Sequence, residues 1–178
     1  PSGISVSFWN RPNAFEETSL YTVTMTGGIP KKIFDKKFGA NFLWSPDGTK
    51  LLVSSVNEKG GSDIRLGIAN QNGGEYGTLQ APTLISKATW SKDSKNIYYA
   101  LPTSMPSGAV LPNDYFDKPI HTKDSFWKMD VTTGKSERII TPEDIQGEQD
   151  SIDLFLDPNE EYLFFTNRND NKVYRIQL

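Results

Sequence analysis

The sequence predicts an all-β protein built from repeated units of four short antiparallel strands. The first observation is that the stretch WSPDGTKLLVSS (44–55) returns as WSKDSKNIYYAL (90–101), with tryptophans 46 residues apart. A looser third copy is LDPNEEYLFFTN (156–167), in which Leu156 takes the place of the tryptophan. The second observation is that a short strand, a glycine turn and another strand follow the copies. No segment shows the 3.6-residue apolar period of a long helix, so strands must form the core.

Each element of the repeat has a local reason to form. The first strand ends at the aromatic residue, and Ser-Pro-Asp-Gly then reverses the chain. In this turn Pro fixes φ, Asp bonds its own backbone and Gly accepts a left-handed φ. The second strand is a nearly continuous apolar run, as in residues 51–53, 97–99 and 162–165. Runs without alternation indicate strands that are covered on both faces. A loop leads to the third strand, and a glycine hairpin leads to the fourth.

Four strands in a repeat of about 45 residues indicate a β-propeller blade. We expect four blades: residues 1–37 without their first strand, 38–80, 81–142, and 143–178 without their last strand. The third blade carries an insert, residues 102–124, that has no counterpart in the other repeats. A β-sandwich also contains many short strands, but a sandwich gives no reason for the sequence to repeat at this interval.

The ends of the chain suggest how the blades are completed. Pro1 stands in the place of Pro46, inside the reversing turn, and the chain stops at the third strand of the last repeat. We expect a C-terminal segment of a larger propeller, with Leu178 as a natural C-terminus and N-terminal blades missing. An open arc leaves blade faces and strand edges that need covering. The missing blades, or a second copy that closes a ring of eight, would cover them.

The repeats resemble the TolB-type β-propeller family, a WD-repeat-like group. Its pattern is an aromatic residue, Ser-Pro-Asp-Gly, an apolar strand, a third strand and a glycine hairpin, matched closely by WSPDGTKLLVSS, SDIRLGI and NGGEYGTL. The spacing is kept in WSKDSKNIYYAL with SFWKMDVTTGKSERI, and more loosely in LFLDPNEEYLFF with KVYRI. The resemblance covers nearly the whole chain and implies the fold. The family includes periplasmic envelope proteins, sensor modules and the propellers of prolyl oligopeptidase-like enzymes. It therefore favours an extracytoplasmic bacterial protein without choosing an activity.

Composition excludes several classes of function. The 178 residues carry a formal net charge of −3 with scattered basic residues, which argues against a nucleic-acid groove. No apolar run is long enough to span a membrane. The absence of cysteine excludes disulfides, thiolate zinc sites and cysteine nucleophiles, and a single histidine excludes multi-histidine metal centres.

The candidate catalytic and metal-binding side chains have simpler explanations. His121 is the one histidine available to a Ser-His-Asp triad, but no Gly-x-Ser-x-Gly motif accompanies it. Turn formation accounts for Asp47, Asp93 and Asp157, which all lie in the turn between the first and second strands of the repeat. The oxygen-rich run 167–171 lacks the glycine and glutamate of a calcium-binding loop and fits a turn between strands. We expect no catalytic site, no metal and no cofactor.

The insert is the best candidate for a binding site. It joins the second and third strands of its blade, and in propellers that connection lies on a face where ligands often bind. Long loops in compact domains are usually functional or disordered, and this one is rich in apolar residues. The corresponding loop of the first blade, 11–19, should share its face. The side chains expected to bind are Trp9, Phe15, Met105, Leu111, Tyr115, Phe116 and His121. The alternative is a lid that packs only on its own blade.

We therefore expect a non-catalytic module that binds a protein or peptide on this face. One alternative is the accessory propeller of a larger enzyme, such as a prolyl oligopeptidase-like hydrolase. Another is a fragment whose role is propeller assembly alone. An enzyme with its site in the central channel is less favoured, because its candidate side chains are explained by turns and loops. The expected partners are a protein or peptide, a second copy or the missing blades, and neither nucleic acid nor a membrane.

Overall fold

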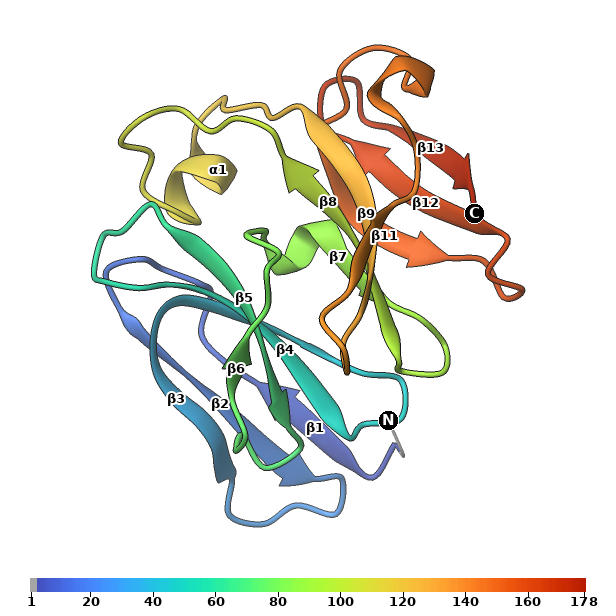
Figure 1. Ribbon diagram of the computed structural model, residues 1–178. Coiled ribbons are helices and arrows are strands. Elements are labelled where there is room, and N and C mark those ends of the chain that lie inside the picture. The colour runs from blue at the N-terminus through green and yellow to red at the C-terminus, as the bar shows by residue number, and fades with distance from the viewer. Residues whose placement is uncertain (1–2) are drawn as a thin grey trace.

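The structure, a computed structural model, describes residues 3–178 and consists mainly of antiparallel strands (Figure 1). The first sheet has the order β1-β2-β3-β4-β5-β6, the second β10-β9-β8-β7 and the third β11-β12-β13. The strands of the first sheet are β1 (Ser5–Phe8), β2 (Glu17–Thr24), β3 (Lys31–Trp44), β4 (Lys50–Val56), β5 (Ile64–Asn70) and β6 (Gly77–Thr78). Those of the second are β7 (Ala88–Trp90), β8 (Asn96–Pro102), β9 (Asp124–Asp130) and β10 (Ser136–Arg138). The third contains β11 (Ser151–Leu156), β12 (Tyr162–Asn167) and β13 (Lys172–Gln177).

The helical elements within residues 3–178 are short. The 3₁₀ helix η1 (Ile85–Lys87) precedes β7, the helix α1 (Asn113–Asp117) lies in the insert, and the 3₁₀ helix η2 (Pro142–Asp144) lies between β10 and β11. None of these helices is long and apolar enough to cross a membrane.

Strand β3 belongs to two blades. Its first part pairs with β2, from Lys31 to Phe38, and its second part pairs with β4, from Phe38 to Trp44 with a register shift between Phe38 and Asn41. The change of partner falls at Gly39, whose φ is +61°. One strand thus serves as the outer strand of the first blade and the inner strand of the second. The expected boundary after residue 37 lies inside this strand, and the division of the chain into blades remains a proposal.

The inner strands end where the repeat predicts. β3 ends at Trp44, β7 at Trp90 and β11 at Leu156. After β3, the Ser45 hydroxyl donates to Asp47 at 2.6 Å, and the backbone N–H of Thr49 donates to the same carboxylate at 3.0 Å. These hydrogen bonds, that from Ser45 first, hold the pKa of Asp47 well below its usual range.

The turn after β7 repeats this arrangement, and in the turn after β11 an aspartate takes the place of the serine. Asp93 accepts hydrogen bonds from the Ser91 hydroxyl and the Lys95 backbone, and Asp157 accepts them from the backbones of Asn159 and Tyr162. The three repeat aspartates therefore build turns, as the sequence predicts.

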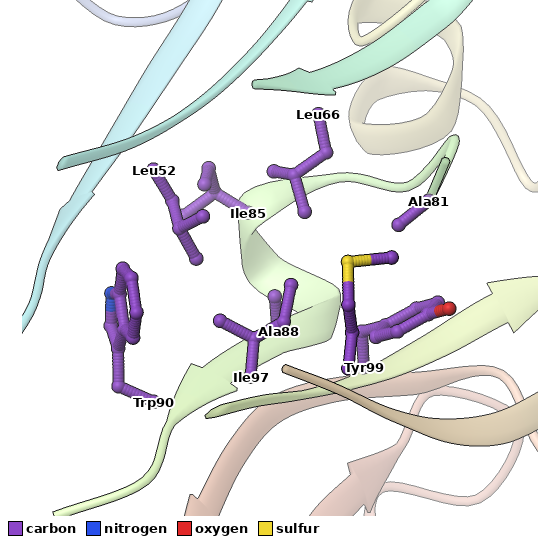
Figure 2. Close-up of a cluster of buried hydrophobic side chains, with 9 residues drawn as sticks. Leu52, Leu66, Ala81, Ile85, Ala88, Trp90, Ile97 and Tyr99 are labelled. Atoms are coloured by element: carbon purple, nitrogen blue, oxygen red, sulfur yellow. The ribbon is translucent and has the colours of Figure 1, made fainter. Parts of the chain in front are cut away.

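The core lies between neighbouring blades. Figure 2 shows Leu52 and Leu66 of the second blade facing Ile97 and Tyr99 of the third, with Ile85 between them. Strand β4 faces both ways, because Leu51 and Val53 pack toward the first blade while Leu52 packs toward the third. The continuous apolar run of β8 is explained in the same way, since alternate residues join the clusters on its two sides.

Strand β12 departs from this expectation. Leu163 and Phe165 are buried against the third blade, but Phe164 faces outward, where its ring stacks on Phe155 at 5.1 Å. Phe155 is 51% exposed. The prediction that the run 162–165 is covered on both faces is wrong for this structure, because no blade among residues 3–178 packs against the outer face.

Candidate ligand-binding face

The insert crosses from the third blade to the other blades. The Leu111 N–H donates to the carbonyl of Gly61, in the connection between β4 and β5, at 3.0 Å. The Asn113 side chain accepts a hydrogen bond of 2.7 Å from the Ala14 N–H, and Arg11 pairs with Asp117 at 2.6 Å. Figure 1 shows α1 on the same side of the molecule as the β4–β5 connection. The alternative of a lid that packs only on its own blade is excluded by these contacts.

Two of the predicted binding residues are core residues of this crossing. Leu111 is 1% exposed and Tyr115 is fully buried, in a cluster with Ala14, Val56 and Leu84. Met105 is partly buried against the same cluster. The expectation that Leu111 and Tyr115 contact a ligand is therefore corrected, because their side chains are buried in the core that holds the insert in place.

A buried ion cluster fastens the insert to the third and fourth blades. Lys87, at the end of η1, is fully buried, and its ammonium lies 2.7 Å from Asp124 and 2.8 Å from Asp150. The Thr122 hydroxyl accepts from the same ammonium at 3.0 Å. Asp150 directly precedes β11, and Arg168, which follows β12, pairs with it at 3.0 Å. The cluster joins the starts of β7 and β11, the inner strands of the third and fourth blades, to the last residues of the insert.

Tyr115 connects α1 to this cluster. Its hydroxyl donates to Asp150 at 2.5 Å, and its ring lies 5.0 Å from the Lys87 ammonium and 4.1 Å from the Arg168 guanidinium. Burial, followed by the hydrogen bond to the Asp150 carboxylate, raises the pKa of Tyr115 far above its usual value. The hydroxyl thus stays protonated and acts as a donor.

Asp150 itself stays ionised. Burial opposes its negative charge, but the Lys87 ammonium and the hydrogen bonds from Lys87, Tyr115 and Thr122 outweigh burial and lower its pKa. Each charge in the cluster has an opposite charge within hydrogen-bond distance, so the arrangement is suited to a structural clamp.

Two further predicted residues lie near the face without lining its pocket. His121 is about half exposed, with Nδ1 3.4 Å from the Asp150 carboxylate at the border of the clamp. Trp9 is partly buried; its indole N–H donates to Asn41 at 3.1 Å, and its ring meets Phe42 edge to face at 5.5 Å. Most of the Trp9 side chain is used in packing within the first two blades.

The face contains a pocket of about 360 Å³ between the loop after β1 and helix α1. The loop contributes Arg11, Asn13 and Glu16, and the insert contributes Phe116 and Asp117. Phe116 is 42% exposed, and its ring stands edge to face on buried Tyr115 at 5.3 Å. The pocket thus lies where the two loops predicted to share a face meet.

Phe15, in the loop after β1, is the second exposed aromatic side chain beside Phe116. It is 50% exposed, and its ring edge lies over Gly60 in the β4–β5 connection. The backbone N–H of Phe15 donates to the Asn13 side chain at 3.0 Å, and Asn13 also accepts from Asn113 at 3.2 Å. The shape of the face is therefore set by three side chains that the sequence did not single out, Arg11, Asn13 and Asn113.

The blades, their order and the pocket together define a β-propeller arc with loops assembled on one face. This sequence matches no protein-family profile and no curated protein. Solved structures do resemble it in fold. TolB from Acinetobacter baumannii matches with a TM-score of 0.58 and 15% identity, over 100% of this chain and 43% of that one. An oligogalacturonate lyase in complex with manganese matches with a TM-score of 0.62 and 16% identity, over 99% and 46%.

An acylaminoacyl peptidase from Pyrococcus horikoshii is a third match, with a TM-score of 0.55 and 16% identity, over 99% of this chain and 31% of that one. The chain spans less than half the length of each of these three proteins. At such identities the similarity shows the fold alone. The chain is thus a TolB-like β-propeller arc in architecture, with both enzymes and TolB among its structural neighbours.

Proposed function

We propose that the chain is a non-catalytic module that binds a protein segment or peptide on the face formed by loop 10–16 and helix α1. The observation that carries the proposal is a pair of half-exposed phenylalanines, Phe15 and Phe116, beside a pocket of about 360 Å³. Exposed aromatic side chains next to a concave surface are the usual anchors of protein interfaces.

The rigidity of the face supports the same proposal. Phe116 belongs to a helix whose neighbouring Tyr115 is fixed by Asp150, and the facing loop is tied to the insert through Asn113 and Arg11. A preorganised surface loses little side-chain and loop entropy on binding, so more of the contact energy appears as affinity.

The test is a selection of random displayed peptides on the whole chain, followed by affinity measurements on three single variants. We expect Phe116→Ala, and to a lesser extent Phe15→Ala, to weaken the selected peptides by about 30-fold or less, as for an anchor worth up to about 2 kcal/mol. Phe155→Ala is the matched control, since Phe155 is equally exposed on the far blade. Equal affinities for all three variants would refute the proposal.

A second candidate is the accessory propeller of a larger enzyme. The observation that favours it is the fold similarity to the acylaminoacyl peptidase, which extends over 99% of this chain. In that case a catalytic domain would contact the arc, and the binding of peptides selected on the isolated chain would not depend on Phe116.

An extracytoplasmic location is also proposed, and it is supported only by the TolB-like architecture.

Further partners are proposed for the end blades. Ile4, Val6 and Phe8 are 67%, 46% and 44% exposed on the first blade, and Phe155 is exposed on the last. A second copy or additional propeller blades would bury these side chains.

A further inference from the structure

The pocket between loop 10–16 and α1 carries more negative than positive charge. Among the described residues, its charged lining consists of Arg11, Glu16 and Asp117. Arg11 pairs with Asp117 at 2.6 Å, so the exposed Glu16 carboxylate has no cation of its own in this pocket. A surface with two carboxylates and a single guanidinium attracts a positively charged group.

The pair between Arg11 and Asp117 leaves room for such a group. It is a single contact between Nη2 and Oδ1, and the two side chains are 75% and 52% exposed. Water screens both charges of an exposed pair, which makes the pair weak. The second oxygen of Asp117 takes no part in this contact and can accept a hydrogen bond from a ligand.

The remaining charges of α1 neutralise one another. Asp114 accepts a hydrogen bond from the Val110 N–H at 3.0 Å, and the Lys118 ammonium lies 2.8 Å from the same carboxylate. The lysine at the end of the helix is thus paired with Asp114, and it does not offset the carboxylates of the pocket.

Phe116 adds an aromatic surface to this negative pocket. Its ring is 42% exposed and is held in place by its contact with the buried ring of Tyr115. A guanidinium can stack on such a ring while its N–H groups pair with carboxylates, whereas an ammonium is a strongly hydrated point charge. The volume of about 360 Å³ lies at the lower end of the range for ligand pockets, roughly 300–1,000 Å³, and suits one long side chain.

The protein already uses this combination of groups in its interior. The Arg168 guanidinium lies 4.1 Å from the Tyr115 ring and pairs with Asp150 at 3.0 Å. One face of the guanidinium is thus covered by an aromatic ring, and a carboxylate accepts its hydrogen bond. The pocket offers the same two groups, Phe116 and Glu16, to a guanidinium from outside.

We propose that the pocket binds an arginine side chain of the partner segment. The guanidinium stacks on Phe116 and pairs with Glu16, and the free oxygen of Asp117 accepts a further hydrogen bond. This inference rests on the proposed function, because it names the residue that the same pocket recognises.

The experiment titrates the whole chain, labelled with ¹⁵N, with N-acetyl-L-argininamide and follows the backbone amides by NMR. We expect shifts in residues 10–16 and 113–117 that saturate with a dissociation constant on the order of 1–10 mM. N-acetyl-L-citrullinamide is the matched control, since it has the same shape without the charge, and it should cause no saturable shift. N-acetyl-L-lysinamide should bind more weakly than the arginine compound.

Four variants assign the contacts. Glu16→Gln should weaken binding of argininamide about fivefold, whereas Glu58→Gln, which removes the same charge from the β4–β5 connection outside this pocket, should not. Phe116→Leu keeps an apolar side chain without the ring and should weaken binding about threefold. Arg11→Gln removes the cation that competes for Asp117 and should strengthen binding about threefold.

Several results would overturn the inference. They are equal shifts with citrullinamide, lysinamide that binds as tightly as argininamide, equal effects of Glu16→Gln and Glu58→Gln, or shifts confined to residues outside the pocket. Selected peptides that depend on Phe116 but contain no arginine would also overturn it and would leave the proposed function intact. Conversely, the absence of any peptide that depends on Phe116 would refute the proposed function, whatever the amides show.

Discussion

Replacement of Lys87 by Met should destabilise the protein strongly. The substitution keeps the length of the side chain but removes the ammonium that lies 2.7 Å from Asp124 and 2.8 Å from Asp150. All three side chains are fully buried, so both carboxylates lose a partner that water cannot replace. Breaking a buried pair by removing one member costs about 3–5 kcal/mol. For a chain of this size that corresponds to a melting temperature lower by roughly 6–20 °C.

Urea denaturation of wild type and variant at neutral and acid pH measures this effect. The penalty should be smaller at acid pH, because protonation removes the negative charge that Lys87 no longer balances. The control is Lys118→Met, which removes a pair with Asp114 at 2.8 Å from a lysine that is 60% exposed. An exposed pair contributes about 1 kcal/mol or less. Equal, small effects for the two variants would refute the interpretation of the cluster as a clamp.

Tyr115, Gly39 and the aspartates with lowered pKa values offer three further tests. Tyr115→Phe removes one hydrogen bond to a buried carboxylate and should cost about 1.5–3 kcal/mol in urea denaturation, and a loss below about 0.5 kcal/mol would contradict the assigned bond. Gly39→Ala places a Cβ atom 2.7 Å from the Pro112 ring, at a residue whose φ is +61°. It should lower the free energy of unfolding by about 1–3 kcal/mol. An unchanged free energy of unfolding would show that the insert does not pack closely against β3. The pKa values of Asp47 and Asp150 are lowered on folding, so their ionised forms stabilise the folded protein above about pH 4. This stabilisation is lost as the pH falls through the pKa values of the folded state. A free energy of unfolding that rises on acidification would contradict the prediction.

The repeat could be predicted because its chemistry is local. The strand that ends at Trp44, the turn around Asp47 and the apolar strand after it are specified by about ten neighbouring residues, and the structure confirms each of them. The all-β propeller architecture followed from the recurrence of that unit. The outward exposure of Phe164 was not predictable in this way, because it depends on which blade lies alongside.

The clamp could not be predicted, because its members are distant in sequence. Lys87 and Asp150 are 63 residues apart, and neither belongs to a repeated or regularly spaced motif. The insert stands out in the sequence because it has no counterpart in the other repeats, and Phe116 of the insert lines the pocket beside loop 10–16. The sequence does not distinguish Phe116 from its neighbour Tyr115, since only the fold decides which ring is buried.

We propose that ligands bind the arc at loop 10–16 and helix α1. The most direct measurement is amide hydrogen exchange of the whole chain with and without a peptide selected on it. We predict slower exchange in residues 10–16 and 113–118 and no change at Lys172–Gln177. Protection confined to the edge of β13, or to the exposed faces of the end blades, would contradict the assignment of the loop face as the binding site.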